Sequence, residues 1–292
     1  MNIGFIGAGR AGCSLGKYIS EFCIKNPVFA ENTNITGYYS SKPEDAQWAA
    51  DFTNSACFAD LNAVVTASDT IVISTPDGAV MKVWDSLIDF DLRGKIICHL
   101  SGSLSSDVFS INEVKGFYPV SVHPLFAFSN KDSIYKQLNK AGFTLEGHEY
   151  AVNAWKNLLS QLGNKVVEID GSVKAKYHAA ASILSNHVLA VLATGYELLE
   201  ECGFSSEEAR SFTKGLVSDN IANAIEKGCV ESLTGPIERN DIATVNKHLS
   251  VLSKAQKEVY HACGNKLLQI SAQKNRHSCP KTQMAIRLKV RG

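Results

Sequence analysis

The sequence has no closely spaced cysteine pairs. Its eight cysteines are scattered over 292 residues, and no two of them are spaced as Cys-x-x-Cys. Because disulfide frameworks and structural zinc sites depend on such pairing, we expect neither in this protein. Free or buried thiols fit a reducing compartment, so the sequence predicts a cytoplasmic protein that holds no metal.

The sequence also has no surplus of charge. Lysine plus arginine and aspartate plus glutamate number 29 each, which gives a formal net charge of zero. Nucleic acids and anionic membranes attract basic surfaces, so we expect neither as a partner. No apolar run reaches the ~18–20 residues of a membrane span, and no basic segment precedes the first apolar run. We therefore expect no membrane segment and no signal peptide.

The most informative feature that is present is the segment Gly7-Ala8-Gly9-Arg10-Ala11-Gly12. It follows an apolar run that predicts a strand and precedes residues that predict the first turns of a helix. In this motif Gly7 makes a tight turn, Gly9 lets the backbone approach a pyrophosphate, and Gly12 lets the helix pack closely on the sheet. The helix N-terminus then offers free N–H groups to the anion. The sequence therefore predicts a dinucleotide site, the alternative being a plain glycine turn.

Strands and helices alternate over the first part of the chain. Apolar runs that predict strands lie at residues 34–39, 69–74, 95–99, 117–122, 143–146 and 166–169. Near-continuous apolar strands separated by helices are typical of a parallel sheet that is covered on both faces. The predicted fold class is therefore α/β, with a Rossmann doubly wound parallel sheet.

The pattern changes after residue 170, and an all-helical C-terminal domain is expected to follow. Residues 173–201 are helical and almost wholly apolar, and further helices are predicted at 206–227, 241–262 and 264–274. We expect three parts: a Rossmann domain (residues 1–170), a helical domain for substrate binding and dimerisation (171–275), and a basic, mobile tail (276–292).

The cofactor is expected to be NADP. In NAD-binding sheets an Asp or Glu at the end of the second strand holds the ribose 2′-hydroxyl. Here that position has Ser40, Ser41 and Lys42, whose hydroxyls and ammonium suit a 2′-phosphate. Arg10 could stack on the adenine or add positive charge. The alternative is an ordinary solvated turn.

Polar residues follow three of the predicted strands, at the edge where ligands bind in open α/β sheets. Thr75 and Pro76 are expected beside the nicotinamide ribose. Ser101 and Gly102 could offer a hydroxyl and a backbone N–H to an anionic or carbonyl group. His123 would either contact the substrate or make a structural hydrogen bond, and His99 could simply be a hydrogen-bonded core histidine.

A polar stripe runs along the first helix of the second domain. Lys174, His178, Ser182 and Ser185 are spaced to share one face, with Asn186 beside it. Buried polar groups cost about 1–3 kcal/mol each unless they are paired, so the stripe would meet a ligand or form an internal network. A partly desolvated lysine could donate a proton, with the histidine assisting. The alternative is an exposed lysine and a histidine bonded to the backbone.

Several segments together resemble a known family. They are Gly7-Ala8-Gly9-Arg10-Ala11-Gly12, His99-Leu100-Ser101-Gly102, His123-Pro124-Leu125, Lys174-x-x-Tyr177-His178-Ala179-Ala180 and Leu233-Thr234-Gly235-Pro236-Ile237-x-Arg239-x-Asp241. Over about residues 1–270 the chain resembles Rossmann-like NADP oxidoreductases that carry a helical C-terminal domain of unknown function. That family usually has Arg-Gly-Asp where this chain has Arg239-Asn240-Asp241.

More distantly, the chain is similar to 3-hydroxyisobutyrate dehydrogenase, pyrroline-5-carboxylate reductase and 6-phosphogluconate dehydrogenase. In the hydroxyacid dehydrogenases of that group a lysine and an asparagine four residues later act at the start of the same helix. This chain has Lys174 and then His178. The resemblance thus implies a catalytic lysine and leaves the asparagine role and the substrate open.

The first functional hypothesis is an NADP-dependent oxidoreductase that acts on a small carbonyl, imine or hydroxyl compound. Lys174 and His178 would be catalytic, while Ser101 and His123 would orient the substrate and Arg239 would bind a carboxylate or phosphate. An imine reductase differs from this only in substrate. The competing hypothesis is a non-catalytic NADP-binding or sensing protein.

The sequence further predicts a homodimer. Residues 173–201 are apolar on more than one face, and such a helix must be buried on all sides. A helical domain this small offers few partners, so a second copy is the simplest cover. Related dehydrogenases, by resemblance, pair through this domain. We expect a buried area above ~2,000 Å², with residues 234–241 and His248 close to the nicotinamide pocket of the same or the partner chain.

Overall fold

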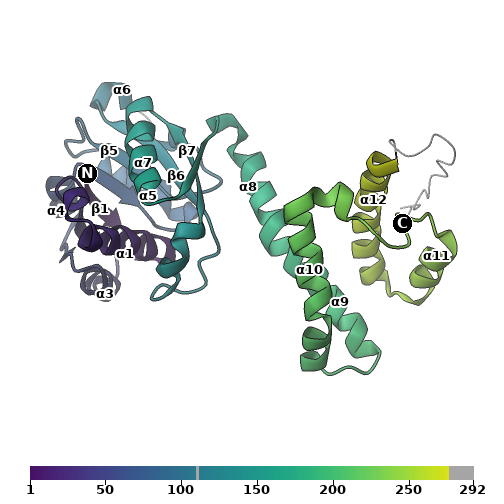
Figure 1. The fold of residues 1–292 in the computed structure, drawn as a ribbon. Helices are drawn as coiled ribbons and strands as arrows, with labels where there is room; N and C mark the ends of the chain where they lie inside the picture. The colour runs from purple at the N-terminus through teal and green to yellow at the C-terminus, as the bar shows by residue number, and fades with distance from the viewer. Residues whose placement is uncertain (110–111, 276–292) are drawn as a thin grey trace. The chain divides into compact units, whose positions relative to one another are not determined.

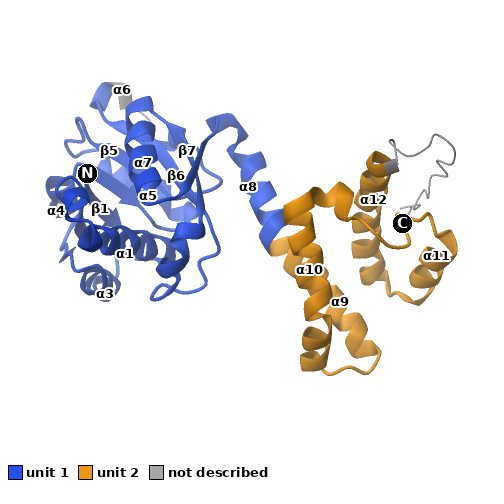
Figure 2. Cartoon of the chain, viewed as in Figure 1, with its two compact units in different colours: residues 1–185 blue, residues 186–292 orange. Residues whose placement is uncertain are grey.

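The computed structural model describes residues 1–109 and 112–275 of the chain. It divides into two compact units, residues 1–185 and residues 186–292 (Figure 2). The boundary predicted near residue 170 lies before this division, at the 3₁₀ turn Gly171–Val173 that begins a long helical run. The predicted mobile tail, residues 276–292, lies outside the described residues.

The first unit is built on one eight-stranded sheet (Figure 1). The strands are β1 (Asn2–Ile6), β2 (Asn34–Tyr39), β3 (Ala56–Cys57), β4 (Thr70–Ile73), β5 (Ile96–His99), β6 (Tyr118–Leu125), β7 (Gly142–Gly147) and β8 (Lys165–Glu168). Their spatial order is β3-β2-β1-β4-β5-β6-β7-β8. The order reverses direction between β1 and β4, which is where open α/β sheets bind ligands. The predicted α/β fold class is confirmed.

One strand pair departs from the expected parallel sheet. Every neighbouring pair is parallel except β6 and β7, which run antiparallel with His123 opposite Thr144. The segment between them contains a 3₁₀ helix, Ile134–Lys140, and returns the chain on the same edge of the sheet. A parallel β7 would need a crossover that carries the chain back to the end of the sheet where β6 begins. This connection stays at the end where β6 finishes, so β7 runs antiparallel to β6.

Helices cover both faces of the sheet. They are α1 (Arg10–Lys25), α2 (Pro27–Ala30), α3 (Pro43–Thr53), α4 (Leu61–Ala67), α5 (Asp77–Leu87), a 3₁₀ turn (Ser106–Val108), α6 (Asn112–Lys115) and α7 (Glu149–Gln161). Buried side chains of α1, α3 and α7 form one core with the sheet, which includes Phe5 and Trp155. Those of α4 and α5 form the second, which includes Trp84. The apolar strands of the sequence are thus buried on both sides.

A continuous helical run leaves the first unit. It comprises a 3₁₀ turn (Gly171–Val173), α8 (Lys174–Ser182), a π-helical turn (Ile183–His187) and α9 (Val188–Glu201). The run Gly171–Glu201 is long and apolar enough to cross a membrane by length and composition alone. One such helix is weak evidence for a membrane span, so the expectation of no membrane segment stays a prediction. The π turn also changes the residue spacing, because each turn takes more residues than in an α-helix.

Up to residue 275, where the described part ends, the second unit continues with α10 (Ser206–Ser232), α11 (Ile242–Val251) and α12 (Lys254–Asn275). Helices α9, α10 and α12 contact one another. Gly228 interrupts α10 with a φ of 83°, in the left-handed region that favours glycine. The single helix predicted at 241–262 is instead two helices, because Leu252 adopts an extended conformation and ends α11.

Candidate active site

The glycine-rich segment forms the turn between β1 and α1. Gly7 has a φ of 99°, and its N–H donates to the carbonyl of Tyr39 at 2.8 Å. A Cβ on Gly12 would overlap the side chain of Ser74, so only glycine lets α1 approach β4 this closely. Gly9 is less constrained, because its Cβ would meet only the carbonyl of Ser74 at 3.5 Å. The turn has the geometry that the motif predicts.

The start of α1 is suited to an anion. Gly9 precedes the helix and supplies no side-chain cap, so the first N–H groups of α1 have no intrahelical partner. Within the described ranges, the buried Oγ1 of Thr75 has no hydrogen-bond partner either. A dinucleotide would supply acceptors for such N–H groups and could contact this hydroxyl. The residues present therefore fit a dinucleotide phosphate beside Gly9 and a ribose beside Thr75 and Pro76.

The end of β2 carries no acid. Ser40, Ser41 and Lys42 follow the strand, the last two exposed, and the N–H of Lys42 donates to Ser40 Oγ at 3.3 Å. Lys42 stands at the N-terminus of α3, which also has no side-chain cap. Arg10 is exposed and donates to the carbonyl of Ser129 at 3.3 Å. These hydroxyls and cations fit a 2′-phosphate better than a free 2′-hydroxyl.

The loop after β5 is held by an aspartate. Asp77, the first residue of α5, accepts hydrogen bonds at Oδ2 from the hydroxyls of Ser101 (2.8 Å) and Ser103 (2.7 Å). The Ser101 hydroxyl also accepts the N–H of Leu104 at 3.1 Å. The hydroxyl expected to meet the substrate is thus engaged in shaping the loop, and the loop is locked to the neighbouring helix.

Lys174 is buried beneath this loop. Its Nζ donates to the carbonyl of Ser101 at 2.9 Å and to the hydroxyl of Ser121 at 2.6 Å, and the residue is 2% exposed. Burial lowers the pKa of this amine below its usual value, while Glu146 acts in the opposite direction. The exposed lysine of the alternative interpretation is therefore not found.

Glu146 lies in the same buried region. Its carboxylate accepts from the N–H and the hydroxyl of Ser106 at 2.7 and 2.8 Å. Burial raises its pKa, and these hydrogen bonds partly oppose that shift. The carboxylate fixes the 3₁₀ turn after the loop and provides a negative charge for the lysine.

Two imidazoles flank Gly102. A Cβ on this glycine would lie 2.6 Å from Nδ1 of His178 and 2.7 Å from Nε2 of His123, so no larger residue fits without displacing a ring. His123 Nδ1 is hydrogen-bonded to the hydroxyl of Tyr177 at 2.7 Å. Burial lowers the pKa of His123 to about 4, with smaller contributions from Lys174 and His178, so its ring is neutral at pH 7.

His99 is a core histidine, as one interpretation of the sequence had it. Its Nε2 is 3.1 Å from the carbonyl of Ser105, and its Nδ1 accepts the N–H of Ser101 at 3.2 Å. Burial lowers its pKa to about 4. The ring therefore stays neutral and supports the loop.

The structure gathers most of the predicted substrate residues in the first unit. Ser101, Gly102, His123, Lys174 and His178 lie together near the carboxyl ends of β5 and β6. Asn186 and Arg239 are exposed and belong to the second unit. The predicted stripe is not one buried face, because Lys174 is buried whereas His178 and Ser185 are exposed.

Four residues of the site were not predicted: Asp77, Ser121, Glu146 and Tyr177. Tyr177 is three residues after Lys174, so helical spacing alone could have placed it beside the lysine. Asp77 closes the polar run at the end of β4. No sequence signal marks Ser121 or Glu146, because both reach the site through the pairing of β6 with its neighbours.

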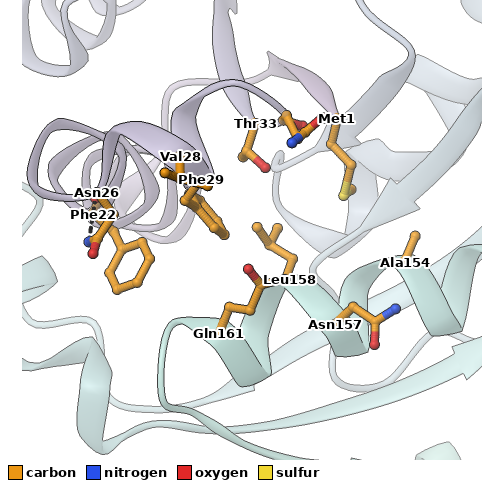
Figure 3. A pocket seen from close by; sticks show the side chains of 11 residues that line it. Met1, Phe22, Asn26, Val28, Phe29, Thr33, Ala154, Asn157, Leu158 and Gln161 are labelled. Carbon is orange, nitrogen blue, oxygen red and sulfur yellow. Dashed lines mark hydrogen bonds between the residues drawn. The ribbon is translucent and has the colours of Figure 1, made fainter.

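Two further features of the first unit bear on ligand binding. An open pocket of about 580 Å³ lies at the amino ends of β1 and β2, lined by residues such as Met1, Phe29 and Leu158 (Figure 3). It contains none of the predicted site residues. Among the described residues, no group of three or more His, Cys, Asp or Glu side chains is arranged to hold a metal ion.

The C-terminal region matches a known sequence family. Residues 141–267 match the family described as a domain of unknown function (DUF2520). This span includes β7, α7 and most of the helical unit. No curated protein sequence matches the chain.

Solved structures share the fold over almost the whole chain. A protein from Thermotoga maritima is 24% identical, with a TM-score of 0.70 over 94% of this chain and 99% of its own. A Bacteroides fragilis protein, provisionally assigned as an NADP oxidoreductase, is 20% identical, with a TM-score of 0.70 over 92% and 98%. Pyrroline carboxylate reductase from Plasmodium falciparum, solved with NADP bound, is 13% identical, with a TM-score of 0.59 over 95% and 97%.

These likenesses confirm the predicted resemblance at the level of the fold. An imine reductase and a reductive aminase share the same fold. They show that the chain has a Rossmann-like fold with a helical C-terminal region, and its C-terminal region also matches the domain of unknown function.

Proposed function

We propose that this protein is an NADP-dependent oxidoreductase that transfers a hydride between nicotinamide and a small carbonyl, imine or hydroxyl carbon. The observation that carries the proposal is the single sheet edge that brings together a phosphate-binding turn and a titratable cluster. The turn is Gly7–Gly12, and the cluster comprises His123, Lys174, Tyr177 and His178. Both lie near carboxyl ends of parallel strands of one sheet, the turn after β1 and the cluster by β5 and β6, where open α/β sheets bind ligands.

NADP would supply the hydride donor or acceptor. The backbone around Gly9 would bind the pyrophosphate, and Ser40, Ser41 and Lys42 would bind the 2′-phosphate. Ala8, Ala11 and Arg10 complete the turn, and Thr75 would contact the ribose through its unpartnered hydroxyl. Proteins that share the fold are described with NADP or NADPH bound, which supports this choice of cofactor.

The substrate would lie beside the Ser101–Gly102 loop. The N–H of the neutral His123 imidazole can donate one hydrogen bond to a carbonyl oxygen or an imine nitrogen, and the N–H groups of the loop can orient the substrate. Asn186 and Arg239, both in the second unit, stay predicted substrate-binding residues, the guanidinium for a carboxylate or phosphate. A reductive aminase of this fold binds ethyl levulinate, which supports a small carbonyl or imine as the substrate class.

The cofactor is tested by titration. We expect NADPH to bind at least about tenfold more tightly than NADH, or about 1.4 kcal/mol, as one or two charge-assisted contacts would give. Ser40→Asp should reverse the preference, because a carboxylate repels the 2′-phosphate and binds the 2′-hydroxyl. Equal affinities for the two cofactors in isothermal titration would contradict the proposal.

The chemistry is tested by following NADPH oxidation with a panel of ketoacids, semialdehydes and cyclic imines. A second candidate, a non-catalytic NADP-binding or sensing protein, is favoured by one observation: the amino group of Lys174 is buried and already engaged. NADPH binding without turnover of any panel member would favour that candidate.

We further propose a cytoplasmic homodimer that pairs through the helical unit. Large apolar side chains of α9 and α10 are exposed in the single chain, including Leu189 (64%), Phe212 (76%) and Ile225 (81%). Apolar surface on this scale is typical of interaction sites, and a second copy supplies a matching surface. We expect the interface to bury more than ~2,000 Å².

A further inference from the structure

The proposed reduction needs a proton as well as a hydride, and this inference about its source rests on the proposed function. When the hydride adds to the carbon of a C=O or C=N group, the π electrons move to the heteroatom, which then needs a proton. A proton donor must be within hydrogen-bonding reach of that heteroatom. The titratable groups of the first unit differ in whether they can meet this condition.

Lys174 is poorly placed to do so. Two of its three N–H bonds point to the carbonyl of Ser101 and to the hydroxyl of Ser121, at 2.9 and 2.6 Å. The side chain is 2% exposed, so a substrate would have to displace the loop to reach it. The geometry makes Lys174 a positioning residue that fixes the Ser101–Gly102 loop from below.

Tyr177 meets the condition better. It lies one helical turn after the lysine, on the same helix, and its side chain is half-buried rather than enclosed. Its hydroxyl is 2.7 Å from Nδ1 of His123, and the two rings meet edge to face with centroids 5.5 Å apart. A phenol that accepts a hydrogen bond from an imidazole can donate its own proton to a third atom.

The far side of the His123 ring leads towards solvent. Its Nε2 lies close to Gly102, and Nδ1 of His178 lies close to the same glycine. The rings of the two histidines are perpendicular, with centroids 6.1 Å apart, and His178 is exposed. Three side chains from α8 and β6 therefore form a series from solvent to the phenol.

We propose that Tyr177 is the catalytic proton donor and that His123 and His178 return a proton to it from solvent. The Tyr177 O–H bond breaks as the bond from hydrogen to the substrate oxygen or nitrogen forms. The Nδ1–H bond of His123 breaks as the phenolic O–H re-forms, and Nε2 takes up a proton delivered from water by way of His178. Proton exchange with water then restores the Nδ1–H tautomer for the next turnover. One hydride from the cofactor and one proton from water thus reach the substrate.

The direct test is the turnover of a panel substrate by Tyr177→Phe, which keeps the ring and removes the hydroxyl. We expect kcat to fall by about 100-fold or more while the Kd for NADPH changes by less than about twofold. The matched control is Tyr150→Phe on α7, where the side chain is 58% exposed and its ring contacts Tyr118 at the amino end of β6. The control should keep wild-type kcat and KM.

His123 is tested by chemical rescue. His123→Ala should lose turnover, and added imidazole should restore part of it if the ring relays protons. If the ring had only a structural role, added imidazole would not restore the turnover of His123→Ala. Lys174→Met should raise KM and lower kcat without making the variant responsive to added amines, because it acts through the loop.

The outcomes separate the inference from the proposed function. Full activity of Tyr177→Phe on a substrate that the wild type reduces would overturn the inference and leave the proposed function in place. Restoration of Lys174→Met by added alkylamine would overturn it as well, because the lysine would then be the donor. Absence of turnover by the wild type with every panel member would overturn both.

Discussion

The two units of this chain bury their apolar side chains to different extents. In the first unit, large side chains such as Trp84 (1% exposed), Trp155 (0%) and Phe5 (0%) are enclosed by the sheet and its helices. In the second unit, Phe212 (76%) and Leu216 (68%) are exposed on α10. The first unit therefore has a complete core of its own, whereas the second unit exposes apolar surface that association with another protein surface would bury.

The largest expected effect concerns the core of the first unit. Trp155→Ala should lower the free energy of unfolding by about 3–5 kcal/mol, because it leaves a cavity in a filled core. Phe212→Ala, in the second unit, should cost far less in the monomer, because that ring is already in water. Denaturant unfolding followed by far-UV circular dichroism measures both variants.

If Trp155→Ala and Phe212→Ala lowered the free energy of unfolding by the same amount at every protein concentration, the stated difference between the two units would be refuted. All three tryptophans, at positions 48, 84 and 155, lie in the first unit. Their fluorescence therefore reports on that unit alone, whereas circular dichroism reports on both. Non-coincident transitions would show that the units unfold separately.

A smaller effect is the acid sensitivity of the first unit. Burial lowers the pKa of His99 from 6.5 to about 4, so the unfolded chain takes up a proton at this residue before the folded protein does. The stability it contributes is full above pH 6.5 and is lost as the pH falls towards 4, by about 3 kcal/mol in total. Glu146 acts in the opposite direction, because its raised pKa favours protonation of the folded state.

This sensitivity can be measured by tryptophan fluorescence in denaturant at pH 7 and near pH 4.5. NMR titration of the His99 imidazole gives its pKa directly. A ring that titrates near 6.5 in the folded protein would show that it is not buried as described, and the predicted loss of stability would vanish with it.

The next effect tests whether a second copy covers the second unit. Light scattering at micromolar concentration should give twice the single-chain mass of 31.7 kDa. Leu216→Glu should weaken association by about tenfold to 100-fold, because it places a charge in an apolar interface. Val114→Glu, at an exposed apolar position of the first unit, is the matched control and should leave the mass unchanged. A mass near 31.7 kDa for the wild type would refute the dimer.

The two units also differ in how far the sequence predicted them. The turn from Gly7 to Gly12 was predictable because its constraints are local: a positive φ and a close helix–strand approach. The antiparallel pairing of β7 was not, since it depends on where residues 126–141 return the chain. In the helical unit, the break at Leu252 lies in a segment that has no glycine or proline. The local signal there is the capping box of Ser253 and Gln256, which begins α12 and which the prediction of a single helix did not use.

The site was predicted in the same uneven way. Ser101, His123 and Lys174 were found because strand ends and helical spacing mark them. The bonds that define their roles were not, because they join residues up to 73 positions apart, as between Lys174 and Ser101. The burial of this lysine depends on contacts with residues far away in the sequence. Spacing alone therefore could not decide whether the lysine or Tyr177 is the proton donor.

The smallest expected effect concerns the ends of helices, where the two units again differ. In the second unit Ser205 and Glu208 form a capping box at the start of α10, so Ser205→Ala should cost about 1 kcal/mol. In the first unit α1 begins at Gly9 without a side-chain cap. Gly9→Ser fits its φ of −78° and should change the stability of the cofactor-free protein by no more than a few tenths of a kcal/mol.

The same Gly9→Ser substitution should weaken NADPH binding, because the new hydroxyl would occupy N–H groups that the pyrophosphate needs and would keep the backbone away from it. Thermal unfolding with and without NADPH gives both quantities in one experiment. We expect a melting temperature that is nearly unchanged without NADPH, together with a reduced shift on its addition. A shift equal to that of the wild type would mean that the pyrophosphate does not bind at the start of α1.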